Sequence, residues 1–137
     1  MTSKETCWKD TALDAEKRRK HPLISSFQFG FEGIAAAARE RNVQIHFGIS
    51  VFVILSGFLF EINKYEWIAV ILCIAGMVSL EMMNTAIERT VDMYTEEFHP
   101  LAKQAKDIAA GAVLIFAIAS VITGLIIFLP KISAWFR

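Results

Sequence analysis

The sequence predicts an all-α integral membrane protein with three transmembrane helices and one amphipathic helix at the membrane surface. Apolar residues make up 55% of the 137-residue chain, above the share of about 45–50% that is usual in soluble proteins. They gather in three long segments separated by polar links. The formal net charge is +0, so the overall charge does not favour nucleic acid as a partner.

A charged arm, residues 1–21, opens the chain, and we expect it to be flexible. Its basic cluster, Lys17-Arg18-Arg19-Lys20, fits either a solvated cytoplasmic tail or a segment attracted to anionic lipid. The first long apolar segment begins only near Ile45, and no small-residue cleavage site with an apolar core precedes it. We therefore expect no cleavable signal peptide.

Residues 22–43 are predicted to form an amphipathic helix that lies in the interface plane. Apolar side chains recur there at helical spacing, and a charged stretch from Arg39 to Arg41 follows. A core helix of a soluble domain is the alternative, but the three membrane-length segments that follow disfavour it. The apolar positions are Phe27, Phe31, Ile34, Ala35 and Ala38.

The apolar segments predict spans at about 44–61, 67–90 and 107–130, so that 22–137 forms a single membrane domain. A spanning helix needs about 20 mostly apolar residues. The third segment carries no charge from Ile108 to Pro130, whereas the second contains Glu81. That carboxylate is tolerated only if it faces protein or water. Small residues in the third segment, Gly111 and Gly124, predict close helix packing.

The distribution of lysine and arginine predicts the orientation. The arm before the first span is rich in both, whereas the link 61–66 contains only Lys64. Cytoplasmic loops carry the excess of positive residues. The N-terminus and the link 89–107 are therefore predicted to lie on the cytoplasmic side.

A polar face on the second span is the strongest functional signal. Glu81, Asn84, Glu88 and Asp92 follow one another at spacings of three, four and four, which places them on one side of a helix. A charge at the centre of a membrane helix costs roughly 2.5–3.5 kcal/mol, so an ionisable residue there is a functional-site hypothesis. The predicted orientation places this face at the cytoplasmic end of the span.

Two other pieces of chain reach the same depth, one with Glu40 and one with Lys106-Asp107. Mg²⁺ typically takes one or two carboxylates together with substrate phosphates, which makes Glu40 and Glu88 the candidate ligands. Glu81 lies about two turns deeper than Glu88 and could act as a general base toward a lipid alcohol. Lys106 could neutralise phosphate charge.

Each of these residues also has a structural interpretation. Glu81 could be a buried acid bonded to a neighbouring helix, and Glu88 could be solvated at the helix end together with Asp92. Lys106 could be a snorkelling anchor of the third span, and Asp107 could be its N-cap.

The two histidines near the spans, His46 and His99, fit the membrane interface better than a ligand set. Several soluble-enzyme signatures are absent from the sequence: the G-x-x-x-x-G-K-[ST] phosphate loop, the protein-kinase set, the G-x-S-x-G elbow and the H-E-x-x-H pair. The residues alone therefore predict a small three-span membrane protein with an acidic site on the cytoplasmic side.

Two motifs carry a family resemblance. The run Glu81-x-x-Asn84-Thr85-Ala86-Ile87-Glu88-x-x-Val91-Asp92 is followed by Ala105-Lys106-Asp107-x-Ala109-Ala110-Gly111. At this separation they resemble the bacterial small membrane kinases that act on diacylglycerol or undecaprenol, and the resemblance runs from about Ser26 to Pro130. Residues 38–46 and 123–132 look more like the Gram-positive branch, which phosphorylates undecaprenol.

The resemblance implies a homotrimer in the bacterial plasma membrane, with three spans and an amphipathic surface helix in each subunit. ATP and Mg²⁺ would serve transfer of the γ-phosphoryl group to a lipid hydroxyl at the cytoplasmic interface. A diacylglycerol kinase with the same site is the nearest rival. A non-enzymatic channel or assembly protein, with acids along a water path, is a rival of another class.

The resemblance also assigns roles by motif match. Glu81 would be the proton acceptor, supported by Asn84, and Met82 would lie with Glu81 beside the lipid. Glu40 and Glu88 would hold the metal that bridges the ATP phosphates. Four further residues fall where the family contacts nucleotide: Glu97, His99, Lys106 and Asp107.

Overall fold

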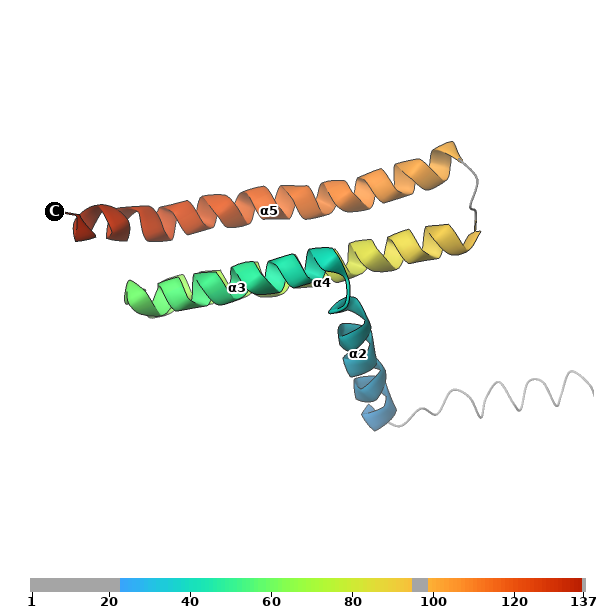
Figure 1. Cartoon of the computed structure of the whole chain (residues 1–137), viewed down its shortest axis with the longest axis horizontal. Helices are drawn as coiled ribbons and strands as arrows, with labels where there is room; N and C mark the ends of the chain where they lie inside the picture. The colour runs from blue at the N-terminus through green and yellow to red at the C-terminus, as the bar shows by residue number, and fades with distance from the viewer. Residues whose placement is uncertain (1–22, 95–98, 137) are drawn as a thin grey trace, which may run out of the picture. The chain divides into compact units, whose positions relative to one another are not determined.

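The structure is a computed structural model that describes residues 23–94 and 99–136. Every regular element in these two ranges is a helix, and they contain no strand. Figure 1 shows the helices, whose bounds are α2 Leu23–Ala37, α3 Arg41–Leu59, α4 Lys64–Tyr94 and α5 Pro100–Trp135.

Three helices are long and apolar enough to cross a membrane: Arg41–Leu59, Lys64–Met93 and Pro100–Trp135. Their large apolar side chains are mostly exposed on the single chain, with Phe52 at 71% and Ile115 at 72%. A soluble domain buries most such side chains, whereas lipid or a second subunit can cover them in a membrane. The predicted all-helical chain with three candidate spans is therefore confirmed.

The described residues fall into two compact units that divide between Ala36 and Ala37. The first unit contains almost all of α2, which exposes Phe27 and Phe31. This helix ends at Ala37, six residues before the end of the predicted helix 22–43.

A turn at residues 38–40 separates α2 from α3 and was not predicted. The backbone amide of Glu40 donates to the Ala37 carbonyl at 2.9 Å, and the Gln44 side chain donates to the Ala38 carbonyl at 3.2 Å. These bonds satisfy carbonyls that a helix end leaves without an intrahelical partner. The turn therefore makes Glu40 the N-cap residue of α3.

A capping box begins α4. The Asn63 side chain accepts hydrogen bonds from the backbone amides of Tyr65 and Glu66, at 2.9 and 3.1 Å. The Glu66 carboxylate accepts one in return from the Asn63 amide at 2.6 Å. This reciprocal arrangement fixes where the helix begins. Glu61, two residues before Asn63, has a φ of 47° and lies in the turn after α3.

The last helix begins earlier and ends later than the predicted span 107–130. Pro100 opens α5, a favoured place for proline because the first helical amides have no intrahelical acceptor. Pro130 lies inside the helix, which continues to Trp135. Membrane helices tolerate such a proline where nearby groups compensate, and here the Ser133 hydroxyl donates to the Pro130 carbonyl at 2.8 Å.

Both α3 and α5 pack against α4 (Figure 1). Away from the polar face, Ile62, Val70 and Ile127 form a buried apolar cluster. Lys131 of α5 pairs with Glu66 of α4 at 3.2 Å near this cluster. Apolar packing and the Lys131–Glu66 ion pair thus hold the helices together at the end that is distant from the polar face.

The close approach of α4 and α5 depends on Gly76. A Cβ atom there would lie 2.9 and 3.1 Å from Cε1 and Cε2 of the Phe116 ring. Gly111 and Gly124 were predicted to serve this packing, but a Cβ at either position would meet no atom within 4 Å. Within the described part of one chain the tight contact is formed at a glycine of α4, and close packing at Gly111 and Gly124 stays a prediction.

Candidate active site

The polar face of α4 is buried at Glu81 and Asn84. Glu81 is 3% exposed and Asn84 is 6% exposed. Asn84 Nδ2 donates to Oε1 of Glu88, one turn further along, at 2.9 Å. The helical register thus joins the buried amide to the Glu88 carboxylate, as the spacing of four predicts.

One buried polar atom on this face has no hydrogen-bond partner among the described residues. Asn84 Oδ1 is buried without a donor. No hydrogen bond or ion pair reaches the Glu81 carboxylate within the described ranges. The described residues therefore contain no bond of the kind expected if Glu81 were a structural acid bonded to a neighbouring helix. Buried polar groups without partners are costly and call for an explanation.

Glu40 reaches this face from another helix. It is the N-cap residue of α3, but its side chain makes no capping hydrogen bond, although acids at such positions often do. Its Oε1 instead accepts from Arg89 Nη2 at 2.5 Å. Because Arg89 directly follows Glu88 in α4, the ion pair brings Glu40 to the helix segment that carries Glu88.

Lys106 and Asp107 have different partners in the structure. Lys106 Nζ pairs with Asp92 of α4 at 2.5 Å, which ties α5 to the last turns of α4. Asp107 pairs with Lys103 on its own helix at 2.5 Å. The interpretation of Asp107 as the N-cap of the third span is wrong, because α5 begins seven residues earlier and His99 is its N-cap residue.

The remaining predicted nucleotide contacts are less defined. His99 is exposed, and its side chain makes no capping hydrogen bond. Glu97 lies outside the described residues. Met82 is half-buried on α4, next to Glu81. The structure therefore brings Glu40 and Lys106 to α4 but links neither Asp107 nor His99 to the polar face.

The carboxylates fit a magnesium site only if substrate completes it. The described residues contain no group of three or more His, Cys, Asp or Glu side chains that could hold a metal. Mg²⁺ usually takes one or two carboxylates together with substrate phosphates. Glu40 and Glu88 each have one oxygen engaged, Oε1 in both cases. Their other oxygens make this donor set compatible with Mg²⁺ held partly by phosphate.

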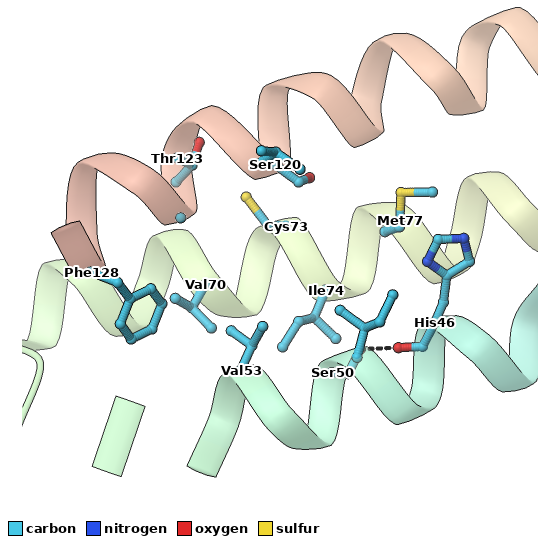
Figure 2. Close-up of a pocket in the computed structure, with 13 residues that line it drawn as sticks. His46, Ser50, Val53, Val70, Cys73, Ile74, Met77, Ser120, Thr123 and Phe128 are labelled. Atoms are coloured by element: carbon cyan, nitrogen blue, oxygen red, sulfur yellow. Dashed lines mark hydrogen bonds between the residues drawn. The ribbon is translucent and has the colours of Figure 1, made fainter. Parts of the chain in front are cut away.

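An apolar groove of about 220 Å³ lies between α3, α4 and α5. Figure 2 shows Met77 and His46 toward one end of it and Phe128 toward the other. Met77 is four residues before Glu81, about 6 Å of helical rise, so the groove opens close to the buried acid. His46, predicted to be an interface residue, lines this groove, and its carbonyl accepts from Ser50 Oγ at 2.7 Å.

Two residues in contact with the predicted site were missed by reasoning from the sequence. Arg89 received no role, and Asp92 was assigned only to the polar face, although each pairs with a predicted site residue. They are three positions apart on α4, on neighbouring helical positions. A cation next to a series of acids was the available signal for Arg89.

The family follows from comparison with known proteins. The family model for prokaryotic diacylglycerol kinase matches residues 28–128. The chain belongs to the prokaryotic diacylglycerol kinase family. The matched range contains Glu40 and the whole polar face of α4. It also contains Lys106-Asp107, so the candidate site residues described above all lie within the match.

Individual relatives align with most of this chain. It is 54% identical to the undecaprenol kinase of Bacillus subtilis over 123 residues, which is 88% of this chain and 100% of that protein. It is 39% identical to the diacylglycerol kinase of Synechocystis over 112 residues, 80% of this chain and 64% of that protein. The diacylglycerol kinase of Escherichia coli K12 is 29% identical over 103 residues, 74% of this chain and 84% of that protein.

Proposed function

We propose that the protein is an ATP-dependent lipid kinase that transfers the γ-phosphoryl group to the hydroxyl of undecaprenol. The observation that carries this proposal is the burial of Glu81 and Asn84 on a helix long enough to span a membrane. The similarity to an undecaprenol kinase over that protein's whole length supports the choice of lipid.

Glu81 is the general base in this proposal. It accepts the proton of the lipid hydroxyl while the alcohol oxygen forms a bond to the γ-phosphorus and the bond from that phosphorus to the bridging oxygen breaks, which releases ADP. Asn84 supports the base in this proposal: it lies three residues from Glu81, its Nδ2 donates to Glu88, and its buried Oδ1 has no donor among the described residues. A positioned base of this kind contributes about 10²–10⁴-fold to a rate.

Glu40 and Glu88 would hold Mg²⁺ together with the ATP phosphates, and the ion would supply charge neutralisation. Phosphoryl transfer depends on positioning and electrostatic stabilisation more than on covalent chemistry. Lys106 adds positive charge from α5. Its contact with Asp92 at 2.5 Å keeps the ammonium at the level of these acids. Glu97, His99 and Asp107 are proposed as further nucleotide contacts.

The acceptor lipid approaches from the membrane. The groove between α3, α4 and α5 is almost entirely apolar and ends near Met77, which suits a prenyl chain whose hydroxyl points toward Glu81. Met82 lies beside that hydroxyl. Glu88 is seven residues shallower than Glu81, about 10 Å along the helix. The nucleotide is therefore proposed to bind at the Glu88 level and the alcohol at the Glu81 level.

The proposed setting is the bacterial plasma membrane, with the N-terminus and the site on the cytoplasmic side. The excess of lysine and arginine before the first span supports this orientation. We propose that α2 lies in the interface plane and that three copies assemble, with neighbouring subunits covering part of the exposed apolar surface. Lipid and ATP are the proposed partners, and nucleic acid is not among them.

The test is phosphate transfer by detergent-purified protein supplied with labelled ATP, Mg²⁺ and either undecaprenol or diacylglycerol. The proposal expects label in the polyprenol at a kcat/KM above that for diacylglycerol. A higher kcat/KM for diacylglycerol than for undecaprenol would make diacylglycerol the preferred substrate. The similarity to diacylglycerol kinases favours that outcome. No transfer to any lipid alcohol would favour a non-enzymatic membrane protein.

A further inference from the structure

The ion pair between Arg89 and Glu40 links residues 49 positions apart, on α4 and at the start of α3. Arg89 Nη2 and Glu40 Oε1 are 2.5 Å apart, and the two side chains are 56% and 40% exposed. Exposed ion pairs of this kind contribute little to folding stability. The pair therefore needs another explanation, and its position beside Glu88 suggests one.

The N-cap position gives Glu40 a choice of partners. A carboxylate there can turn back to cap the amides of its own helix. In this structure it makes no capping bond and reaches across to α4 instead. The contact with the guanidinium is made by Oε1, so Oε2 is not used in the pair that brings Glu40 to the α4 segment carrying Glu88.

We propose that Arg89 is a positioning residue for the metal site: it holds Glu40 away from the α3 amides and against α4, so that Glu40 and Glu88 converge on one divalent cation. This inference rests on the proposed function, and no role has been given to Arg89 there. A carboxylate that binds a metal is usually oriented by a hydrogen-bond partner, and loss of the partner typically costs about 10–100-fold in metal affinity or activity.

Arginine suits this role better than lysine would. Its planar guanidinium keeps a fixed direction toward a carboxylate, whereas the lysine ammonium is a flexible point charge. Arg89→Lys should therefore preserve the charge but orient Glu40 less well. Arg89→Gln should remove the charge and most of the reach across to α3.

The test measures Mn²⁺ binding, as a spectroscopic stand-in for Mg²⁺, by electron paramagnetic resonance of the detergent-purified full chain with a non-hydrolysable ATP analogue. We expect Arg89→Gln to weaken Mn²⁺ binding by about 10–100-fold and Arg89→Lys to restore part of it. In the Glu40→Gln background, Arg89→Gln should produce no further loss, because Arg89 acts through Glu40.

A matched control removes an ion pair between helices that is far from the polar face, Lys131–Glu66, which lies beside the apolar cluster. Lys131→Gln should leave Mn²⁺ binding unchanged, and thermal unfolding of both variants checks that they fold. The inference is overturned if Arg89→Gln binds Mn²⁺ as the unmodified protein does, if that protein itself binds none, or if the two substitutions at Arg89 and Glu40 are additive. Absence of lipid phosphorylation with intact Mn²⁺ binding would count against the proposed function alone.

Discussion

Asn84 Nδ2 donates a hydrogen bond to Glu88 Oε1 at 2.9 Å, while the buried Oδ1 of the same side chain has no donor among the described residues. One end of the amide thus orients a carboxylate proposed to bind metal. Asn84 also lies three residues from Glu81, at which the lipid hydroxyl is proposed to arrive. The same side chain can therefore affect both substrates.

Asn84→Ala is expected to lower kcat about 10–100-fold, the usual cost of removing a residue that orients a metal ligand. The half-saturating Mg²⁺ concentration should rise as well, because Glu88 loses its partner. Steady-state kinetics over a Mg²⁺ titration measures both effects. Thr90→Ala is the control, since Thr90 Oγ1 bonds only to the Ala86 carbonyl of its own helix. Unchanged kinetics for Asn84→Ala would remove this residue from the site.

Gly124→Leu tests the groove as the place of the prenyl chain. Gly124 lines the groove, and a Cβ there would meet no atom within 4 Å, so a larger side chain fills the space without a clash at its Cβ. The KM for undecaprenol should rise several-fold while the KM for ATP stays the same. Gly48→Leu is the matched control, because Gly48 is equally open and is not a lining residue. An equal effect of both substitutions would argue against the groove.

Gly76→Ala tests the packing of α4 against α5. The new Cβ would press on the Phe116 ring, and overpacking of this kind costs typically about 1–3 kcal/mol. Thermal unfolding in detergent should show a lower transition temperature. Gly111→Ala adds the same methyl group where no atom lies within 4 Å and should unfold at the original temperature. A Gly76→Ala variant with unchanged unfolding would mean that the ring moves away without cost.

Much of the fold could be predicted from the sequence because a bilayer imposes simple rules. An uncharged run of membrane length predicts a span, and the third segment obeys this rule. The actual start of α5 at Pro100 was missed since residues 100–107 are polar and were interpreted as a link. Helix propensity and a proline at the first position extend the helix beyond the part that hydropathy detects.

The site was predicted less completely. The register of Glu81, Asn84 and Glu88 follows from helical spacing, which is a local property. The contacts of Glu40 with Arg89 and of Lys106 with Asp92 depend on how α3 and α5 lie against α4, and on the turn at residues 38–40. Spacing along one helix contains no such information. The capping box of Asn63 and Glu66, in contrast, has a local signature that could have been found.

The central claim is that Glu81 accepts the proton of the lipid hydroxyl, and Glu81→Gln tests it most directly. The amide keeps the size of the side chain but cannot act as the base. We expect kcat for phosphate transfer to undecaprenol to fall about 10²–10⁴-fold, while binding of a non-hydrolysable ATP analogue and thermal unfolding stay as in the unmodified protein. Transfer at the original rate, or loss of the fold without a selective loss of turnover, would contradict the account.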